Sequence, residues 1–202
     1  QNSSKIANED SQAFEFDDTN IFDLNRYAGT DRITGGSRID YGIRTSIAKD
    51  DGQQSELLFA QSYRFAGSSS FGEASGLEHE KSDYIGRFTF FPNDAFNINY
   101  RFRLDRENFS PNRVELGLNL FHPQHTMGLD YILIDEQSET EEFGNREQLD
   151  FNINSQLLEN WTSSLQLVQD FKDNSNRTIK ASLGVTYTDE CFTIGLQYQR
   201  ED

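Results

Sequence analysis

The chain has 202 residues and a formal charge of −16, with 34 acidic against 18 basic side chains. Hydrophobic residues make up 35% of it and its mean hydropathy is −0.74, and no run approaches the roughly 18 apolar residues of a membrane-spanning helix. The acidic balance argues against nucleic acid as a partner, because phosphate binding needs clustered Lys and Arg, whereas 17 Phe and 8 Tyr argue against a disordered chain.

Residues 1–36 form the first predicted unit, a polar N-terminal segment followed by a loop. Residues 1–18 show neither helical nor strand periodicity, so we expect them to be irregular. Residues 20–36 are rich in Asn, Asp, Arg and Gly, which favour turns. No basic and apolar signal-peptide regions open the sequence, and it stops after a strand-like run. We therefore expect a piece of a longer protein.

Residues 37–202 form the second predicted unit, in which apolar and polar side chains alternate. This period of two predicts antiparallel β-strands. The pattern is weaker in two of the runs, where Gln61, Ser163 and Gln169 fall on the apolar side. We predict ten strands, over residues 38–47, 56–65, 83–91, 96–105, 113–120, 126–133, 149–157, 161–171, 178–187 and 191–199.

Charged side chains in these runs fall on one face only. Such sorting is expected if the apolar face meets lipid, where a Lys or Arg at the midplane costs roughly 2–4 kcal/mol. A soluble β-sandwich buries one face of each sheet and would show similar alternation. The polar face is predicted to carry Asp40, Arg44, Arg64, Arg87, Arg101, Arg103, Asp105, Glu115, Asp130, Asp150, Asp170 and Lys180.

Strand length and connection length favour the membrane alternative. The runs have about 9–11 residues, the length of a tilted membrane strand, whereas soluble strands have about 5–6. Short and long connections also alternate, as in outer-membrane barrels with tight periplasmic turns and long external loops. The fold class predicted is all-β, an antiparallel transmembrane β-barrel of which about ten strands are present. In this topology residues 20–36 form an external or lumen-folded loop, and Cys191 lies on the oxidising periplasmic side.

A set of residues in and after the loop resembles the LptD family of lipopolysaccharide assembly proteins. Shorter stretches at residues 59–65, 82–86 and 183–200 extend the likeness over most of residues 9–200. The residues that carry it are Phe16, Asp17, Asp18, Asn20, Phe22, Asn25, Arg26, Gly29, Asp31, Arg32, Gly36, Arg38, Tyr41 and Gly42.

The resemblance implies a role in inserting lipopolysaccharide into the outer leaflet of the Gram-negative outer membrane. It implies a late portion of a much larger barrel, without the jellyroll domain and without either edge of the lateral gate. The implied partners are lipopolysaccharide, an LptE-like lipoprotein in the lumen, and an LptA-like periplasmic bridge reached through the missing N-terminal domain. Cys191 would form a disulfide with a cysteine of that missing region, although Glu190 stands where relatives often have a second cysteine.

Two groups of residues have both a functional and a structural interpretation. Asn25, Arg26, Gly29, Asp31 and Arg32 form the family-motif loop, which would shape the lipopolysaccharide path or the lipoprotein seat. Alternatively the loop is clamped by its own Arg–Asp pairs, with glycines at its turns. The lumen-facing charged residues would meet lipid phosphates or the lipoprotein, or else pair across strands. They are Arg87, Arg101, Arg103, Asp105, Glu115 and Asp130. We favour the structural interpretation for both groups.

Catalytic and metal sites have little support. His122 and His125 flank a tight turn, whereas the topology puts His79 at the opposite side of the membrane, so the three cannot form one site. The acidic loop at residues 135–145 lacks the spacing of a calcium loop. No cofactor and no enzyme activity are expected. Two alternatives stay open: a ten-stranded outer-membrane protease using His79 and Asp83, and a soluble acidic β-sandwich used for binding.

Overall fold

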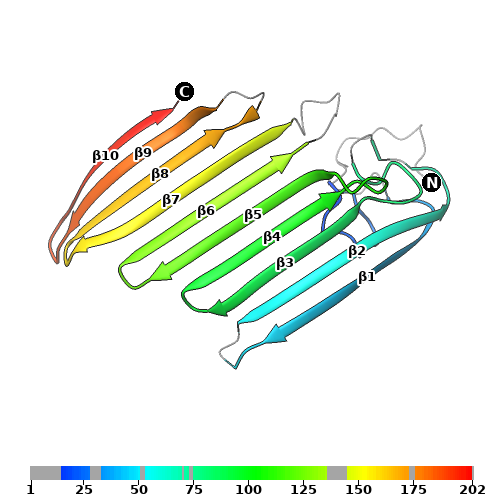
Figure 1. Ribbon diagram of the computed structural model, residues 1–202, viewed down its shortest axis with the longest axis horizontal. Coiled ribbons are helices and arrows are strands. Elements are labelled where there is room, and N and C mark those ends of the chain that lie inside the picture. Colours follow the sequence, from blue (N-terminus) through cyan, green and yellow to red (C-terminus); the bar gives the residue numbers. More distant parts are fainter. Residues whose placement is uncertain are drawn as a thin grey trace.

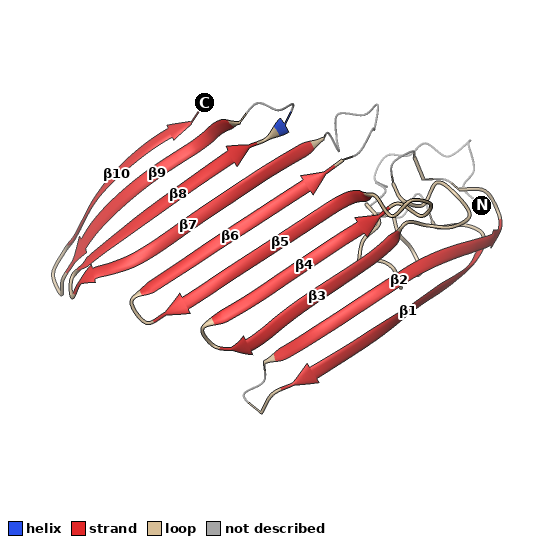
Figure 2. Cartoon of the chain, viewed as in Figure 1, coloured by secondary structure: helices blue, strands red, loops and turns tan. Residues whose placement is uncertain are grey.

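The computed structural model describes residues 15–27, 33–50, 53–69, 71–72, 75–135, 145–172 and 176–201. Its strands are the ten predicted ones (Figures 1 and 2). No helix in the described ranges has the length and hydropathy needed to cross a bilayer. The strands are β1 (Ser37–Ala48), β2 (Gln54–Ala66), β3 (Tyr84–Asn93), β4 (Phe96–Leu104), β5 (Pro111–His122), β6 (His125–Ile134), β7 (Arg146–Leu158), β8 (Trp161–Asp170), β9 (Arg177–Thr188) and β10 (Thr193–Glu201).

The strands form one antiparallel sheet in which each pairs with the next along the chain. Tight turns lie at one end of the sheet and the longer connections at the other (Figure 1). Among the described strands β1 and β10 are the two edges and do not pair, so the sheet is open. The all-β, antiparallel part of the predicted fold is confirmed; closure into a barrel is not shown by this sheet.

The pairing register confirms the predicted separation of faces. On the polar side Arg101 of β4 lies opposite both Arg87 of β3 and Glu115 of β5. The strands extend beyond the predicted runs, however, and the register brings Glu147 and Arg200 to the apolar face, opposite Leu133 and Ala181. Both charges lie at the ends of strands near the long connections. Near the start of β7 the Tyr131 hydroxyl donates to a Glu147 carboxylate oxygen at 2.9 Å.

The buried core is small and lies on the polar side of β2 and β3. Phe16 and Ile21 of the N-terminal segment and Leu77 of a later loop pack there against side chains of both strands. Most of the opposite, apolar face has no second layer of described residues over it, and Ile43 and Leu196 are 71% and 79% exposed. A single-layer sheet with one uncovered apolar face differs from the two facing sheets that a β-sandwich requires.

Gln61 is a polar residue on the apolar face, and its neighbours explain how it is accommodated. Its side chain is buried, and its amide donates to the Ser82 carbonyl at 2.9 Å. Its carbonyl oxygen accepts the hydroxyl of Tyr41, its partner across β1 and β2, at 2.5 Å. Because the amide is hydrogen-bonded on both sides, the usual cost of burying it is offset.

Candidate functional site

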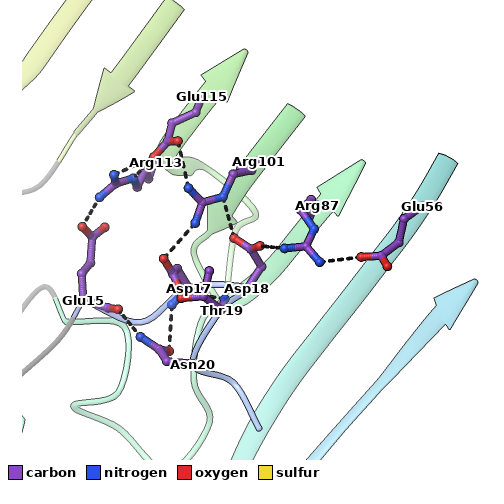
Figure 3. A network of polar contacts seen from close by, with 10 residues as sticks. All are labelled: Glu15, Asp17, Asp18, Thr19, Asn20, Glu56, Arg87, Arg101, Arg113 and Glu115. Carbon is purple, nitrogen blue, oxygen red and sulfur yellow. Dashed lines mark hydrogen bonds and ion pairs between the residues drawn. The ribbon is translucent and has the colours of Figure 1, made fainter. Parts of the chain in front are cut away.

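Residues 15–27 lie against the charged face of the sheet, and we call them the docked segment (Figure 3). Side-chain hydrogen bonds fix its turn. The Asp17 carboxylate accepts from the backbone N–H of Thr19 at 2.8 Å and from its hydroxyl at 2.6 Å. Asn20 accepts from the Asp17 N–H and donates to the Glu15 carbonyl. These local bonds direct three carboxylates of the docked segment toward the strands.

Arg26 fastens the other end of the docked segment. Its side chain is 1% exposed and donates to the Asn20 and Ile21 carbonyls at 3.2 and 2.5 Å. The guanidinium also pairs with the Asp40 carboxylate of β1 at 2.8 Å and lies 5.0 Å from the centre of the Phe16 ring. Burial lowers the pKa of Arg26, and the charge of Asp40 opposes that shift.

Asp40 connects this buried arginine to a second one. Arg38 donates to the other Asp40 oxygen at 3.1 Å and to the carbonyls of Asp23 and Leu24 at 2.5 and 3.2 Å. The Ser62 hydroxyl of β2 donates to Asp40 at 2.5 Å. The start of β1 is therefore joined to the docked segment by the hydrogen bond from Arg26 to Asp40 and by the two that Arg38 donates to the segment's carbonyls.

Asp18 lies between two arginines of neighbouring strands (Figure 3). Its oxygens accept from Arg87 of β3 and Arg101 of β4, both at 2.7 Å, and its side chain is only 3% exposed. Arg87 also pairs with Glu56 of β2 at 2.5 Å. Glu56 in turn accepts from Arg44 of β1 at 2.6 Å. Opposite charges thus alternate across four strands.

The network continues toward β5. Arg101 pairs with Asp17 at 2.9 Å and with Glu115 at 3.2 Å. Arg113 pairs with Glu115 at 2.6 Å and with Glu15 of the docked segment. Arg101 therefore contacts one carboxylate of the sheet and two of the docked segment, and Arg113 contacts one of each. These charge-assisted bonds fix the position of the segment.

Arg103 of β4 is the most deeply buried arginine of the described strands, with 2% of its side chain exposed. It lies 3.1 Å from Glu15 and 3.5 Å from Asp83, the residue just before β3. Burial raises the pKa of Asp83, although Asn112 donates a hydrogen bond to it at 2.8 Å. These contacts tie the loop before β3 to the same network.

The structure brings together most of the predicted charged residues. Arg87, Arg101, Arg103 and Glu115 belong to one network with the docked segment. Asp105 instead caps the β4–β5 turn by accepting the N–H groups of Glu107 and Asn108, which lower its pKa. Asp130 lies on β6, directly across from Asp150 of β7.

The family-motif loop is only partly described. Gly29, Asp31 and Arg32 lie outside the described residues, so a clamp between them and the rest of the loop stays a prediction. The Asn25 side chain accepts the Thr34 N–H at 2.9 Å, which closes the loop locally. Arg26 pairs with a strand residue, Asp40, across 14 positions of the chain.

Sequence reasoning did not single out several members of the network, namely Glu15, Asp17, Asp18, Arg44, Glu56 and Arg113, as charge partners. Asp17 and Asp18 were noted only for the family resemblance. Arg113 and Glu56 could have been found from the alternation of side chains along each strand. Arg113 lies on the same face of its strand as Glu115, and Glu56 on the same face as Arg64. The role of Glu15 carries no sequence signal, because it depends on where the docked segment lies.

The histidines and Cys191 lie apart from this network. The rings of His122 and His125 stack at 5.5 Å beside the β5–β6 turn, whereas His79 is exposed beside Glu78 before β3. Within the described ranges no group of three or more His, Cys, Asp or Glu side chains could hold a metal ion. Cys191 is exposed in the β9–β10 turn, whose backbone N–H groups at Cys191 and Phe192 bond to Asp189.

An antiparallel sheet with one apolar face and one charged face has the two-sided character of the wall of an outer-membrane protein built from β-strands. The comparison with protein families agrees, since residues 1–161 match the family described as LptD, LPS transport system D. The match covers more than half of the chain, so the chain belongs to the LptD family. A comparison with curated proteins gave no match. Residues 183–200, which include Cys191, lie beyond the matched range, and their resemblance stays a prediction.

Membership supports a general role in lipopolysaccharide transport at the outer membrane, and the family is one of transport and assembly proteins, not enzymes. The protease alternative predicted a joint site of His79 and Asp83. Asp83 instead contacts Arg103 and Asn112 and is buried.

Proposed function

We propose that this chain forms part of the wall of an outer-membrane β-barrel that inserts lipopolysaccharide into the outer leaflet. The observation that carries the proposal is the division of one sheet into a largely uncovered apolar face and a charged face on which the docked segment lies against β1 to β5. In this orientation the apolar face contacts acyl chains and the charged face lines a watery lumen. The open edges β1 and β10 would pair with further strands of a longer protein.

The tight turns would face the periplasm and the long connections the exterior. Cys191 would then be available, on the oxidising side, for a disulfide with a cysteine outside this sequence. The docked segment would lie in the lumen, where its Asp18 contacts Arg87 and Arg101 of the wall. An LptE-like lipoprotein would occupy lumen space beside it, and an LptA-like bridge would deliver lipopolysaccharide through an N-terminal domain.

The orientation of the two faces is tested by nitroxide labels on adjacent residues of β4. Ile98 and Asn99 point to opposite faces, so Ile98→Cys and Asn99→Cys variants of the full protein should report different surroundings once labelled. The label at position 98 should collide with oxygen dissolved in lipid, and the label at 99 with a water-soluble nickel complex. Equal accessibility to the nickel complex at both positions would refute the lipid-facing assignment.

The transport role is tested by depleting the full protein in its own cell. The amount of lipopolysaccharide that can be labelled on intact cells should fall while the total amount per cell does not. The reason is that the lipid accumulates without reaching the outer leaflet. A variant in which Ile98 and Tyr100, both on the apolar face, are replaced by Asp should fail to restore export, and Asn97→Asp with Asn99→Asp should restore it. Unchanged surface lipopolysaccharide on depletion would contradict the proposal.

A further inference from the structure

The row of arginines on β1, β3, β4 and β5 carries more positive charge than its own sheet neutralises. Arg44, Arg87, Arg101 and Arg113 are paired on the sheet side with two carboxylates, those of Glu56 and Glu115. Two positive charges remain in excess. Glu15, Asp17 and Asp18 of the docked segment supply three more carboxylates and bring the set to a single negative charge.

Asp18 binds the arginines in the way that a phosphate group would. Its two oxygens accept separate N–H groups from Arg87 and Arg101, both at 2.7 Å, in a nearly dry position. A phosphate ester also presents several anionic oxygens to planar guanidinium groups, and arginine pairs of this kind are frequent phosphate sites. The carboxylate therefore occupies the position that a phosphate would take between these two strands.

A groove of about 460 Å³ opens beside this position, next to Asp18 and Thr19 of the docked segment. Arg87 and Arg101 keep 27% and 26% of their side chains exposed next to it. The groove is large enough to admit a phosphate group and the sugar that carries it. Its lining is Asp18, Thr19, Gln54, Glu56, Arg87, Thr89, Asn99 and Arg101.

We infer that the docked segment masks a phosphate-binding surface, holding its arginines with carboxylates so that a phosphorylated glycolipid passes without being retained. The inference rests on the proposed function in one respect, that the phosphate belongs to a lipid headgroup. The binding of an anionic phosphate ester by paired arginines does not depend on the proposed function. Removing the three carboxylates should uncover the surface.

The experiment titrates inorganic phosphate by calorimetry into the full-length protein in an uncharged detergent. The variant E15Q/D17N/D18N should bind phosphate about tenfold or more tightly than the unaltered protein, because two guanidinium groups become available to one anion. Adding R87Q and R101Q to that variant should remove the gain. Folding of each variant is tested by gel electrophoresis, in which a folded barrel changes its mobility when the sample is heated.

A matched control removes the same charge elsewhere. D50N/E159Q/E190Q changes three exposed carboxylates in tight turns and should leave phosphate affinity within about twofold, because screening weakens distant charges. If the triple segment variant does not fold, Asp18→Asn alone is used, with a smaller gain expected. An unchanged affinity in a folded variant, or an equal gain in the control, would overturn the inference.

A second titration separates the sources of phosphate. Phosphorylated glycolipid and the same lipid after enzymatic dephosphorylation are compared in mixed micelles, and only the phosphorylated form should show the gain. A gain for inorganic phosphate without one for the glycolipid would overturn the assignment to a lipid headgroup. Unchanged surface lipopolysaccharide on depletion, tested separately, would contradict the proposed function and would leave the phosphate titration standing.

Discussion

Replacing Arg26 with Met should release the docked segment from the sheet. The side chain is 1% exposed, and its removal leaves the Asn20 and Ile21 carbonyls without their donor and Asp40 without its closest cation. Breaking a buried ion pair on one side costs about 3–5 kcal/mol. Arg38 and Ser62 still contact Asp40, so we expect the lower end, about 3 kcal/mol.

Hydrogen exchange followed by mass spectrometry measures this loss directly. A cost of about 3 kcal/mol corresponds to more than a hundredfold faster exchange in residues 15–27, since about 1.4 kcal/mol is tenfold. Exchange in β7 and β8 should not change, because these strands do not contact the segment.

A graded set of substitutions makes the test specific. Arg26→Lys keeps the charge but loses the planar fork and should give an intermediate rate. Arg44→Met removes a pair whose arginine is 64% exposed, so it should cost at most about 1 kcal/mol. Protection of residues 15–27 in Arg26→Met equal to that in the unaltered protein would refute the reasoning.

Three further predictions concern turns, packing and the deeper arginines. The Asp189 carboxylate accepts the Cys191 and Phe192 N–H groups, which lower its pKa from 3.8; its support for the turn is therefore full above 3.8 and lost as pH falls through the lowered pKa. Amide exchange at Phe192 should accelerate over that range, and in Asp189→Ala at every pH. Gly42→Ala would place a Cβ 2.6 Å from the Phe59 carbonyl oxygen, whereas at Gly195 the nearest atom is 3.4 Å away. The first should lower the free energy of unfolding by about 1–3 kcal/mol and the second by much less, measured as the midpoint of heat modification. Arg103→Met should expose residues 75–83 to protease because Asp83 and Glu15 lose a shared cation; an unaltered cleavage pattern would count against that role.

Much of the fold could be predicted because strand periodicity is a local property. Alternation along β4 sorts Ile98 from Asn99 whatever the rest of the chain does, and the turn residues set where strands end. The limits of strands were harder to predict. Glu147 and Arg200 joined the apolar face because pairing with the neighbouring strand extends regular structure beyond the clean pattern.

The sequence by itself determined the ten strands, their two faces and the resemblance of the loop to its family. Only the tertiary structure decided which charges meet. Asp18 and Arg101 are separated by 83 positions, and nothing in the spacing of either residue indicates the other. Their pairing follows from the burial of Phe16 and Ile21 under the loop before β3, a long-range packing event that carries three carboxylates of the segment onto the arginine row.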